Sequence, residues 1–436
     1  MRGRSLARAH MQRATAWEVQ DADTILLQHS IEQLLPRLRL AVIFGGDKSV
    51  SESVVYQSQN SRSWKSYQAV AEDIADALRR VGFRHVDVFP EDMRLGDRLR
   101  CAGIHMAWLN SGGVQGYNSA AHGSATLEML GIPYVGHNPL AATTLDNKHI
   151  FKREAMCAGL PTAPFCVWHP ARGPFLPERN SCFKLQFGDY SGPFIVKPVS
   201  GRASLHVHVV SDRAALSEAI DDVYRKTENV VLIEKYLEGR EFCIAVCGRT
   251  IAQGGNIGRM SEPFAFGALE RLFNADELIF TSMDIKPITE SRFRHLDRHH
   301  EPDLWRKIHG LAREIFLEFY LCSLIRIDIR ADEHDNLHIL EANPKPDLKR
   351  PAGGVTSLIS AGLAQTGLSY DDLILSLLAD RLYPMITNGH CCPSHIVELL
   401  DLKRLDDTSS HRNVMPVDEA VLALQAAGRA MRAHKL

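Results

Sequence analysis

The sequence has almost no net charge and no long apolar run. Lysine and arginine number 50 against 52 acidic residues, which leaves a formal net charge of −2 over 436 residues. Such a chain has no global field that would attract nucleic acid or an anionic membrane. No apolar stretch approaches the roughly 20 residues that a membrane-spanning helix needs. We therefore expect neither nucleic acid nor a membrane among its partners.

The cysteines lack the pattern of a disulfide framework. There are nine of them, an odd number, and they are scattered along the chain. This usage is typical of reduced thiols in a cytoplasmic protein. The basic N-terminal segment "MRGRSLARAHMQRATAWEVQ" has no apolar core of the kind that a secretory signal contains. An Arg-rich transit peptide is one interpretation; the acids Glu18, Asp21 and Asp23 favour a plain extension or an extra helix.

Length and patterning indicate two or three α/β-type domains. The apolar content of 45% and the charged content of 23% are ordinary for a globular protein. A strand at 40–44, a helix at 66–81 and a strand at 85–89 begin a parallel α/β unit. Further helices and strands follow; the segments from about 166 to 190 and from about 256 to 300 have loop-like patterns, and 417–435 is predicted to be a helix.

Two strand-like runs, Leu324 to Arg330 and Leu337 to Asn343, contain four polar residues that are costly to bury. These are Arg326, Asp328, Glu341 and Asn343. With a period of two, Arg326 and Asp328 share one face of the first strand, opposite its isoleucines. The same period groups Ile339 with Glu341 and Asn343 on the second strand. Asp335 and Asn336 predict a turn, so the runs form a hairpin that could bring Asp328 beside Glu341. Paired carboxylates with an amide oxygen suit Mg²⁺, while a half-exposed hairpin with a solvated charged face is the alternative.

Seven segments follow one another in a recognisable order: "VIFGGDKSVSE", "LEMLGIPYVGHNP", "LDNKHIFK", "GPFIVKPVSG", "VLIEKYLEGREFCIAV", "IRIDIR" and "ILEANP". This ordered set resembles the D-alanine–D-alanine ligases of the ATP-grasp superfamily. The resemblance spans roughly residues 40–380 and is clearest from Lys148 onward. It implies an ATP-grasp fold of the α/β and α+β class, with an N-terminal parallel α/β domain. The domains that it implies are an N-terminal extension at 1–37, an α/β substrate domain at 38–147, a central ATP-grasp subdomain at 148–240, a C-terminal subdomain with the Mg site at 241–385, and a helical extension at 386–436.

The resemblance also implies which residues hold ATP and metal. ATP is expected to contact Lys148, Lys197, Ser204, Glu234, Lys235, Leu237 and Glu241, with the lysines 148 and 197 on the phosphates. The metal ligands are expected to be Asp328, Glu341 and Asn343, holding two Mg²⁺ ions, with Mn²⁺ as an alternative. Arg326 is expected to stabilise the tetrahedral intermediate, because a permanently charged guanidinium suits a developing oxyanion.

The chain departs from the family pattern around the substrates. In "KPVSGRASLHV", Arg202 and Ala203 stand where glycine and serine are usual, so Arg202 is expected either to replace phosphate contacts of the glycine loop or to slow the lid. Asn110 replaces a usual histidine, and Glu52 aligns with the glutamate that orients the first substrate's amine. In "NPKPDLKRPAGG", the oxyanion-hole glycine is missing, and Lys345, Lys349 and Arg350 replace small residues. A more anionic substrate and a basic surface loop are both consistent with these cations.

The implied function is an ATP- and Mg²⁺-dependent carboxylate–amine ligase that forms an amide bond through an acyl phosphate. The altered substrate loops argue against two D-alanines and favour other small amino-acid-like substrates. Two alternatives are an intramolecular cyclisation of one such substrate and a nucleotide-binding pseudoenzyme. Homodimers are common in the resembled family, and a homodimer is therefore one expectation here.

Overall fold

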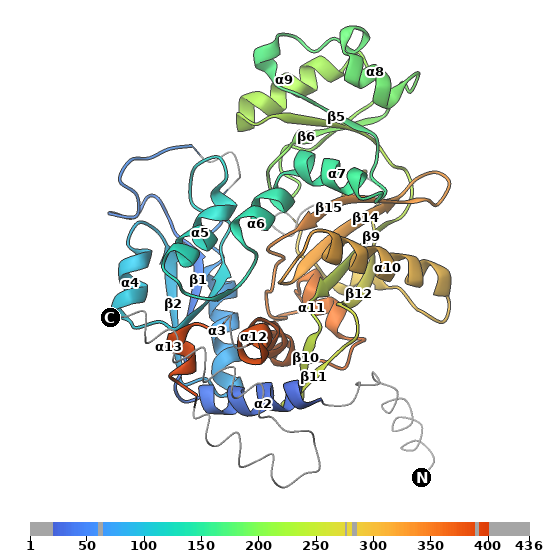
Figure 1. The fold of residues 1–436 in the computed structure, drawn as a ribbon. Coiled ribbons are helices and arrows are strands. Elements are labelled where there is room, and N and C mark those ends of the chain that lie inside the picture. Colours follow the sequence, from blue (N-terminus) through green and yellow to red (C-terminus); the bar gives the residue numbers. More distant parts are fainter. Residues whose placement is uncertain (1–20, 60–63, 275–276, 281–285, 389–391, 401–436) are drawn as a thin grey trace.

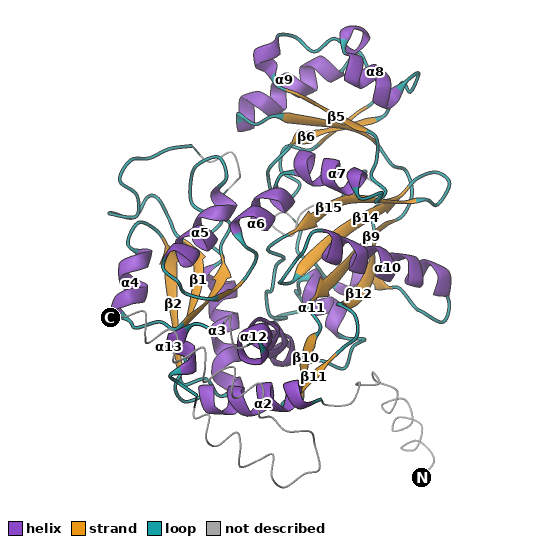
Figure 2. Ribbon diagram, viewed as in Figure 1, coloured by secondary structure: helices purple, strands orange, loops and turns teal. Residues whose placement is uncertain are grey.

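The computed structural model describes residues 21–59, 64–274, 277–280, 286–388 and 392–400. The predicted helix at 417–435 and the first 20 residues lie outside these ranges. The described chain forms three main sheets flanked by helices, with the N-terminal sheet to one side of the other two (Figure 1; Figure 2).

The N-terminal sheet is parallel, as the strand–helix–strand pattern predicts. Its order is β2-β1-β3-β4, with Leu40 of β1 opposite Val86 of β2 and Met106 of β3. Helix α3 packs on β1 and β2, and its apolar stripe is buried while its basic end faces solvent. The elements of this region are β1 (Arg39–Gly45), α3 (Gln68–Val81), β2 (His85–Glu91), α4 (Leu95–Cys101), β3 (Met106–Asn110), α5 (His122–Met129), β4 (Tyr134–Val135) and α6 (Pro139–Asp146).

A four-stranded antiparallel sheet follows, in the order β5-β8-β6-β7, and it carries helices α8 and α9. Its core contains a cluster of phenylalanines, including Phe183, Phe187 and Phe194. The elements are α7 (Lys148–Cys157), β5 (Phe165–Trp168), α8 (Ser181–Phe187), β6 (Phe194–Pro198), β7 (His208–Val210), α9 (Leu216–Thr227) and β8 (Val231–Lys235).

A five-stranded antiparallel sheet faces it, in the order β13-β12-β9-β14-β15, with helix α10 covering one side. Strands β10 and β11 form a separate hairpin against α12 and against α2 (Ala22–Leu34). The elements are β9 (Glu241–Cys247), β10 (Thr250–Gln253), β11 (Asn256–Arg259), β12 (Phe264–Arg271), β13 (Phe293–His295), α10 (Pro302–Glu318), β14 (Ile325–Ala331), β15 (Leu337–Asn343), α11 (Leu358–Leu363), α12 (Tyr370–Thr387) and α13 (Ser394–Val397).

The loop-like interpretation of 166–190 and 256–300 is wrong in part. The first segment holds α8, and the second holds β12, an interior strand between β13 and β9. Seven of the eight residues of β12 are buried, so no alternation of apolar and polar residues marks it in the sequence. A central glycine, Gly267, further masks the strand pattern.

The N-terminal extension contributes helix α2 (Ala22–Leu34), which packs against α12. Its leucines belong to the same buried cluster as the inner face of α12. The main sheets after α7 fall on either side of residue 240, where the domain boundary is predicted; the boundaries themselves remain a prediction. Among the described residues, no helix is both long enough and apolar enough to cross a membrane.

Candidate functional site

Strands β14 and β15 bring the four polar residues of the hairpin together. Asp328 lies directly opposite Glu341, and Arg326 lies opposite Asn343. Asp328 is only 4% exposed, and Arg326, Glu341 and Asn343 are half-buried, so this face of the hairpin is not fully solvated. Because a buried charge is costly without partners, the neighbours of these groups decide what the face can do.

A β-bulge sets the direction of Glu341, and it corrects the simple alternation. The register shifts so that Ile329 pairs with Ile339, and Leu340 becomes an extra residue in β15. Ile339 therefore enters the hydrophobic core, while Glu341 pairs with Asp328 on the opposite face. Grouping Ile339 with Glu341 and Asn343 was wrong for this reason, since a bulge re-aims the side chains that follow it.

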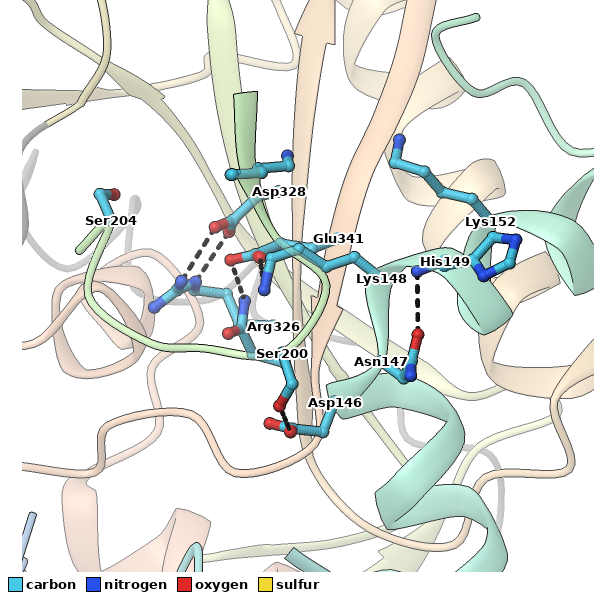
Figure 3. A network of polar contacts seen from close by, with 12 residues as sticks. Asp146, Asn147, Lys148, His149, Lys152, Ser200, Ser204, Arg326, Asp328 and Glu341 are labelled. Carbon is cyan, nitrogen blue, oxygen red and sulfur yellow. Dashed lines mark hydrogen bonds and ion pairs between the residues drawn. The ribbon is translucent and has the colours of Figure 1, made fainter. Parts of the chain in front are cut away.

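Two arginines hold Asp328. Arg326 donates from Nε and Nη2 to the two carboxylate oxygens at 2.8 and 2.9 Å (Figure 3). Arg271, at the end of β12, approaches Asp328 to 2.9 Å and donates to Glu241 at 2.6 Å. Burial opposes the charge of Arg271, but Asp328 and Glu241 raise its pKa well above the usual value. Such bidentate pairs fix both charge and orientation.

Glu341 is held as a carboxylate by surrounding cations. Its Oε2 lies 3.1 Å from Nζ of Lys148, and its Oε1 accepts from the Asn343 amide at 3.2 Å. Burial would raise the pKa of Glu341, but Lys148, Lys197 and Arg326 together hold it well below its usual range. The Glu341 side chain is therefore an anion that can bind a metal ion or accept hydrogen bonds.

A second cluster joins two lysines to Glu234. Lys197 on β6 forms an ion pair with Glu234 on β8, and Lys152 on α7 reaches the same carboxylate at 2.7 Å. Lys152 is fully buried and also donates to the Ile339 carbonyl at 3.1 Å. Burial raises the pKa of Glu234, but the two lysines outweigh it and the pKa is lowered. Glu234 thus orients Lys197. The sequence did not predict a role for Lys152, because a single lysine in a helix is ordinarily solvent-exposed.

The two sheets enclose a cavity between them. All seven residues expected to contact ATP line it, together with Asp328 and Glu341 of the expected metal set. Ser204 lies on the loop after β6, where its Oγ donates to the Phe280 carbonyl at 3.2 Å. The backbone of Lys235 pairs with Pro164 and its side chain with Glu333. The residues expected to contact ATP are Lys148, Lys197, Ser204, Glu234, Lys235, Leu237 and Glu241.

A second cavity continues from the first one. The two share Asp328, Glu341 and Arg271, and the second adds Arg326 and Asn343. Its far wall is formed by Lys345 from the loop after β15 and by the segment before α3, Lys65 and Tyr67. We use "second cavity" below for this space. It lies on the side of the acidic pair away from β6 and β8.

The loop from Gly201 to Val207 covers both cavities. Ala203, Ser204 and His206 have φ values of +64°, +50° and +59°. Non-glycine residues seldom adopt this left-handed conformation, which costs about 1 kcal/mol or more, and it is retained at functional loops. Arg202 lines both cavities and donates to the Trp64 carbonyl at 3.2 Å. This contact ties the loop to the N-terminal domain.

Four expected substrate residues lie elsewhere. Glu52 is two-thirds exposed and pairs with Arg94 at 2.6 Å, and it lines neither cavity. Asn110 is buried and donates to the Tyr67 carbonyl at 3.3 Å, so it supports a cavity residue from behind. Lys349 and Arg350 also line neither cavity; the amide of Arg350 bonds to Asp73 in α3.

Sequence reasoning also missed Arg271, Lys65 and Tyr67. Arg271 ends a strand that the sequence does not reveal, and Lys65 and Tyr67 precede α3 without any motif around them.

Two antiparallel sheets lie on either side of the first cavity (Figure 1; Figure 2). Lys197 lines the cavity from one sheet, and the paired acids Asp328 and Glu341 line it from the other. This arrangement is that of an ATP-grasp ligase fold. A family model described as "D-ala D-ala ligase C-terminus" matches residues 155–379, slightly more than half of the chain. The chain therefore belongs to this family, and it is a D-Ala–D-Ala ligase-like ATP-grasp protein of the class of ATP-dependent C–N ligases.

Individual relatives are similar to this chain over more than half of its length. An uncharacterized protein y4sG of Sinorhizobium fredii is 29% identical over 277 residues, covering 62% of this chain and 73% of that protein. The D-alanine–D-alanine ligase of Pseudomonas putida is 29% identical over 360 residues, covering 79% of this chain and 93% of the ligase.

Solved structures support the fold. The D-alanine–D-alanine ligase of Bacillus anthracis in complex with ATP matches with a TM-score of 0.54 at 18% identity, covering 79% of this chain and 98% of the ligase. The VanG D-Ala:D-Ser ligase of Enterococcus faecalis matches with the same TM-score at 15% identity, covering 79% and 99%.

The donor set fits the metal that the fold implies. Asp328, Glu341 and Asn343 offer two carboxylates and an amide on one face. Within the described ranges, no group of three or more His, Cys, Asp or Glu side chains is placed to hold a metal ion by itself. Mg²⁺ characteristically binds one or two protein carboxylates and completes its shell with phosphates and water, so this incomplete set suits it.

Proposed function

We propose that this chain is an ATP- and Mg²⁺-dependent carboxylate–amine ligase that joins two small amino-acid-like substrates other than two D-alanines. The observation that carries the proposal is the cross-strand pair of Asp328 and Glu341, which joins the two cavities. A nucleotide in the first cavity would place its phosphates at this pair, and the other substrates would meet them from the second cavity.

The first cavity supplies cations for the phosphates. Lys148, Lys197 and Arg271 line it; Lys197 and Arg271 pair with the buried carboxylates of Glu234 and Asp328, and Lys148 pairs with the half-buried Glu341. ATP carries about four negative charges, which need such directed donors. Asp328, Glu341 and Asn343 would hold Mg²⁺. When bound, the ion would neutralise charge on the transferred phosphoryl group.

The reaction has two steps. An oxygen of the donor carboxylate attacks the γ-phosphorus of ATP, the bond to the bridging oxygen breaks, and ADP leaves with that electron pair. The amine nitrogen of the acceptor then attacks the acyl carbon, phosphate leaves, and the nitrogen loses a proton. Neither step needs a covalent enzyme nucleophile.

In this proposal, Arg326 acts in the second step. It lines the second cavity, and Asp328 fixes its guanidinium plane through two hydrogen bonds. A fixed cation facing a developing oxyanion stabilises the tetrahedral intermediate without reorganisation. Glu52 lines neither cavity, so in our proposal the amine of the first substrate is oriented by other groups.

Phosphate release from ATP and Mg²⁺ with single amino acids and with pairs tests the proposal, with product masses as the second readout. Release that requires a pair, and a product equal to the pair minus water, is expected. Release with one amino acid alone, with a product equal to that amino acid minus water, would favour cyclisation instead. ATP binding without release under any condition would favour a nucleotide-binding pseudoenzyme.

A further inference from the structure

A buried arginine near the end of β14, Arg330, lines the first cavity. It is 7% exposed, and the period of two along the strand places it on the same face as Arg326 and Asp328. A buried guanidinium is costly unless its donors are used, so the groups that it contacts indicate what it does.

Arg330 joins β14 to the linker at 236–240, which connects β8 to β9. Its Nη1 donates to Oε2 of Glu241 at 3.3 Å and to the Leu278 carbonyl at 3.2 Å. Its Nη2 donates to the Tyr236 hydroxyl at 2.9 Å, and its Nε donates to the Gly239 carbonyl at 3.3 Å. The Tyr236 hydroxyl in turn donates to the Leu278 carbonyl at 2.9 Å. One planar side chain therefore fixes the linker and the first residue of β9 at the same time.

The backbone also holds the linker against the end of β14. The amide of Gly239 donates to the Ala331 carbonyl at 3.1 Å, and the amide of Ala331 donates to the Arg240 carbonyl at 2.8 Å. A Cβ on Gly239 would lie 2.7 Å from the carbonyl oxygen of Ala331, so only glycine permits this close approach. Arg330 and Glu241 are direct cross-strand partners, which is why their side chains meet on the cavity face.

Two arginines hold the carboxylate of Glu241, one on each oxygen. Oε1 accepts from Arg271 at 2.6 Å, and Oε2 accepts from Arg330 at 3.3 Å. Glu241 is 4% exposed and lines the first cavity. A carboxylate has about four lone-pair sites, so both oxygens can accept a further hydrogen bond from a ligand in the cavity. The two guanidinium groups thus fix the orientation of an acceptor that a ligand can use.

The part of ATP that suits this acceptor is the ribose. The phosphates are anionic and would be repelled by Glu241, whereas the ribose hydroxyls are donors. Arg271 contacts both Glu241 and Asp328, so Glu241 lies one guanidinium away from the acidic pair at which the phosphates are proposed to bind. The ribose directly follows the phosphates in ATP and therefore falls within reach of Glu241.

We infer that Arg330 is a positioning residue for the nucleotide, because it holds Glu241 and the linker in the arrangement that binds the ribose hydroxyls of ATP. The inference rests on the proposed function, since it takes the occupant of the first cavity to be ATP. Arg330 acts through Glu241: without it, the carboxylate keeps only Arg271 as a fixed partner, and its orientation is no longer set from both sides.

Calorimetric titration of the full chain with ADP and with 2′-deoxy-ADP, each in the presence of Mg²⁺, tests this directly. The two nucleotides differ by one hydroxyl. In the unsubstituted protein we expect ADP to bind about tenfold more tightly, because a hydrogen bond to a carboxylate is charge-assisted. Arg330→Met should reduce this ratio to about threefold or less. A variant that weakens both nucleotides equally and keeps the ratio would overturn the inference, since that is the result of a merely structural role.

Two further variants test whether Arg330 acts through Glu241. Glu241→Gln should itself abolish most of the ratio, and the double variant with Arg330→Met should have the same ratio. Discrimination that remains in Glu241→Gln and disappears only in the double variant would place Arg330 on the ribose directly and overturn the inference. Tyr236→Phe removes only the hydroxyl that Arg330 contacts and should lower the ratio about two- to threefold. If Arg330→Met does not fold, as judged by circular dichroism, an unchanged ratio in Tyr236→Phe would overturn the inference.

Arg240→Met is the matched control. Arg240 directly precedes Glu241, but it pairs with Glu270 and Glu301 and lines neither the first nor the second cavity. The substitution removes the same kind of side chain from the neighbouring position and should keep the ratio. A fall equal to that of Arg330→Met would contradict the assignment, because it would show that any loss of charge near Glu241 has the same effect.

Because ADP binding is measured without turnover, the two proposals fail separately. A ratio that depends on Arg330, without phosphate release from ATP under any condition, would overturn ligation and keep the role of Arg330. Phosphate release that requires a pair of amino acids, with a ratio that Arg330→Met leaves unchanged, would keep ligation and overturn the role of Arg330.

Discussion

Nζ of Lys152 lies 2.7 Å from Oε1 of Glu234, and neither side chain is more than 3% exposed. The pair spans α7 and β8 and sits behind Lys197, which contacts the same carboxylate. Since a buried carboxylate that loses a partner retains its desolvation cost, this relationship links the stability of the central sheet to the position of a proposed phosphate ligand.

Lys152→Met should therefore destabilise the protein by roughly 3 kcal/mol, the lower end for breaking a buried pair, because Lys197 remains on Glu234. Urea unfolding monitored by circular dichroism measures it. Lys184→Met on α8, an exposed position, is the matched control and should change stability by less than about 0.5 kcal/mol. The double variant Lys152→Met/Glu234→Gln should recover part of the loss, and strict additivity would contradict the coupling.

Glu341→Gln should abolish phosphate release while leaving the fold intact. The substitution keeps the shape but removes the charge that the cations and the proposed metal require, and loss of one such electrostatic group costs about 10²–10³ in rate. Steady-state phosphate release and the far-UV spectrum are the two readouts. Glu318→Gln, at an exposed position of α10, is the control, and a normal rate in Glu341→Gln would remove the metal assignment.

The stability of Glu91→Gln relative to the unsubstituted protein should increase as the pH rises. Burial raises the pKa of Glu91 from 4.5 to about 7, although Ser111, Gly113 and Gly123 donate to it and oppose the shift. A carboxyl whose folded pKa lies above its unfolded pKa costs no stability below the unfolded value and progressively more up to the folded value. The window is therefore about pH 4.5 to 7, and the full cost is about 3 kcal/mol.

Urea midpoints of Glu91→Gln and the unsubstituted protein at pH 4.5 and pH 8 check this sign. The urea midpoint of the variant should rise relative to that of the unsubstituted protein from pH 4.5 to pH 8. A constant difference would mean that Glu91 titrates normally and that its buried position imposes no pH dependence.

Asn110→Ala should raise the KM for the amino-acid substrates by about three- to tenfold and leave the KM for ATP unchanged. The substitution removes the hydrogen bond to the Tyr67 carbonyl, so the strained backbone of Tyr67 can relax away from the second cavity. Initial rates with each substrate varied in turn provide the measurement. An equal rise in both KM values would indicate a general loss of structure.

The order of motifs predicts the ATP-grasp fold because each motif couples a local pattern to a fixed place in the sheets. Lys197 at the end of a strand and Asp328 in an alternating strand could both be located in this way. The pairing of Asp328 with Glu341 was also predicted from the hairpin, but the side of the sheet on which Ile339 lies was not, because one inserted residue, Leu340, breaks the alternation in β15.

The substrate side was less predictable, because it is built from contacts between distant segments. Lys65 and Lys345 are 280 positions apart, and only the folded chain brings them to the same ring. Lys349 and Arg350 show the converse: they share a basic loop with Lys345, yet the path of the backbone takes them away from the cavity.

Gly267→Ala should destabilise the protein by about 2 kcal/mol or more. The φ of Gly267 is +65°, and a Cβ there would lie 2.5 Å from Cα of Gly362 in α11, a backbone atom that cannot move aside easily. Left-handed strain and overpacking both add to the cost. Gly310→Ala is the matched control, because Gly310 lies inside α10 and its added Cβ meets nothing within 4 Å. That substitution should stabilise by about 0.5–1 kcal/mol, since alanine is the better helix former. Urea unfolding of both variants measures the difference, and equal stabilities would show that β12 and α11 tolerate a side chain at their closest approach.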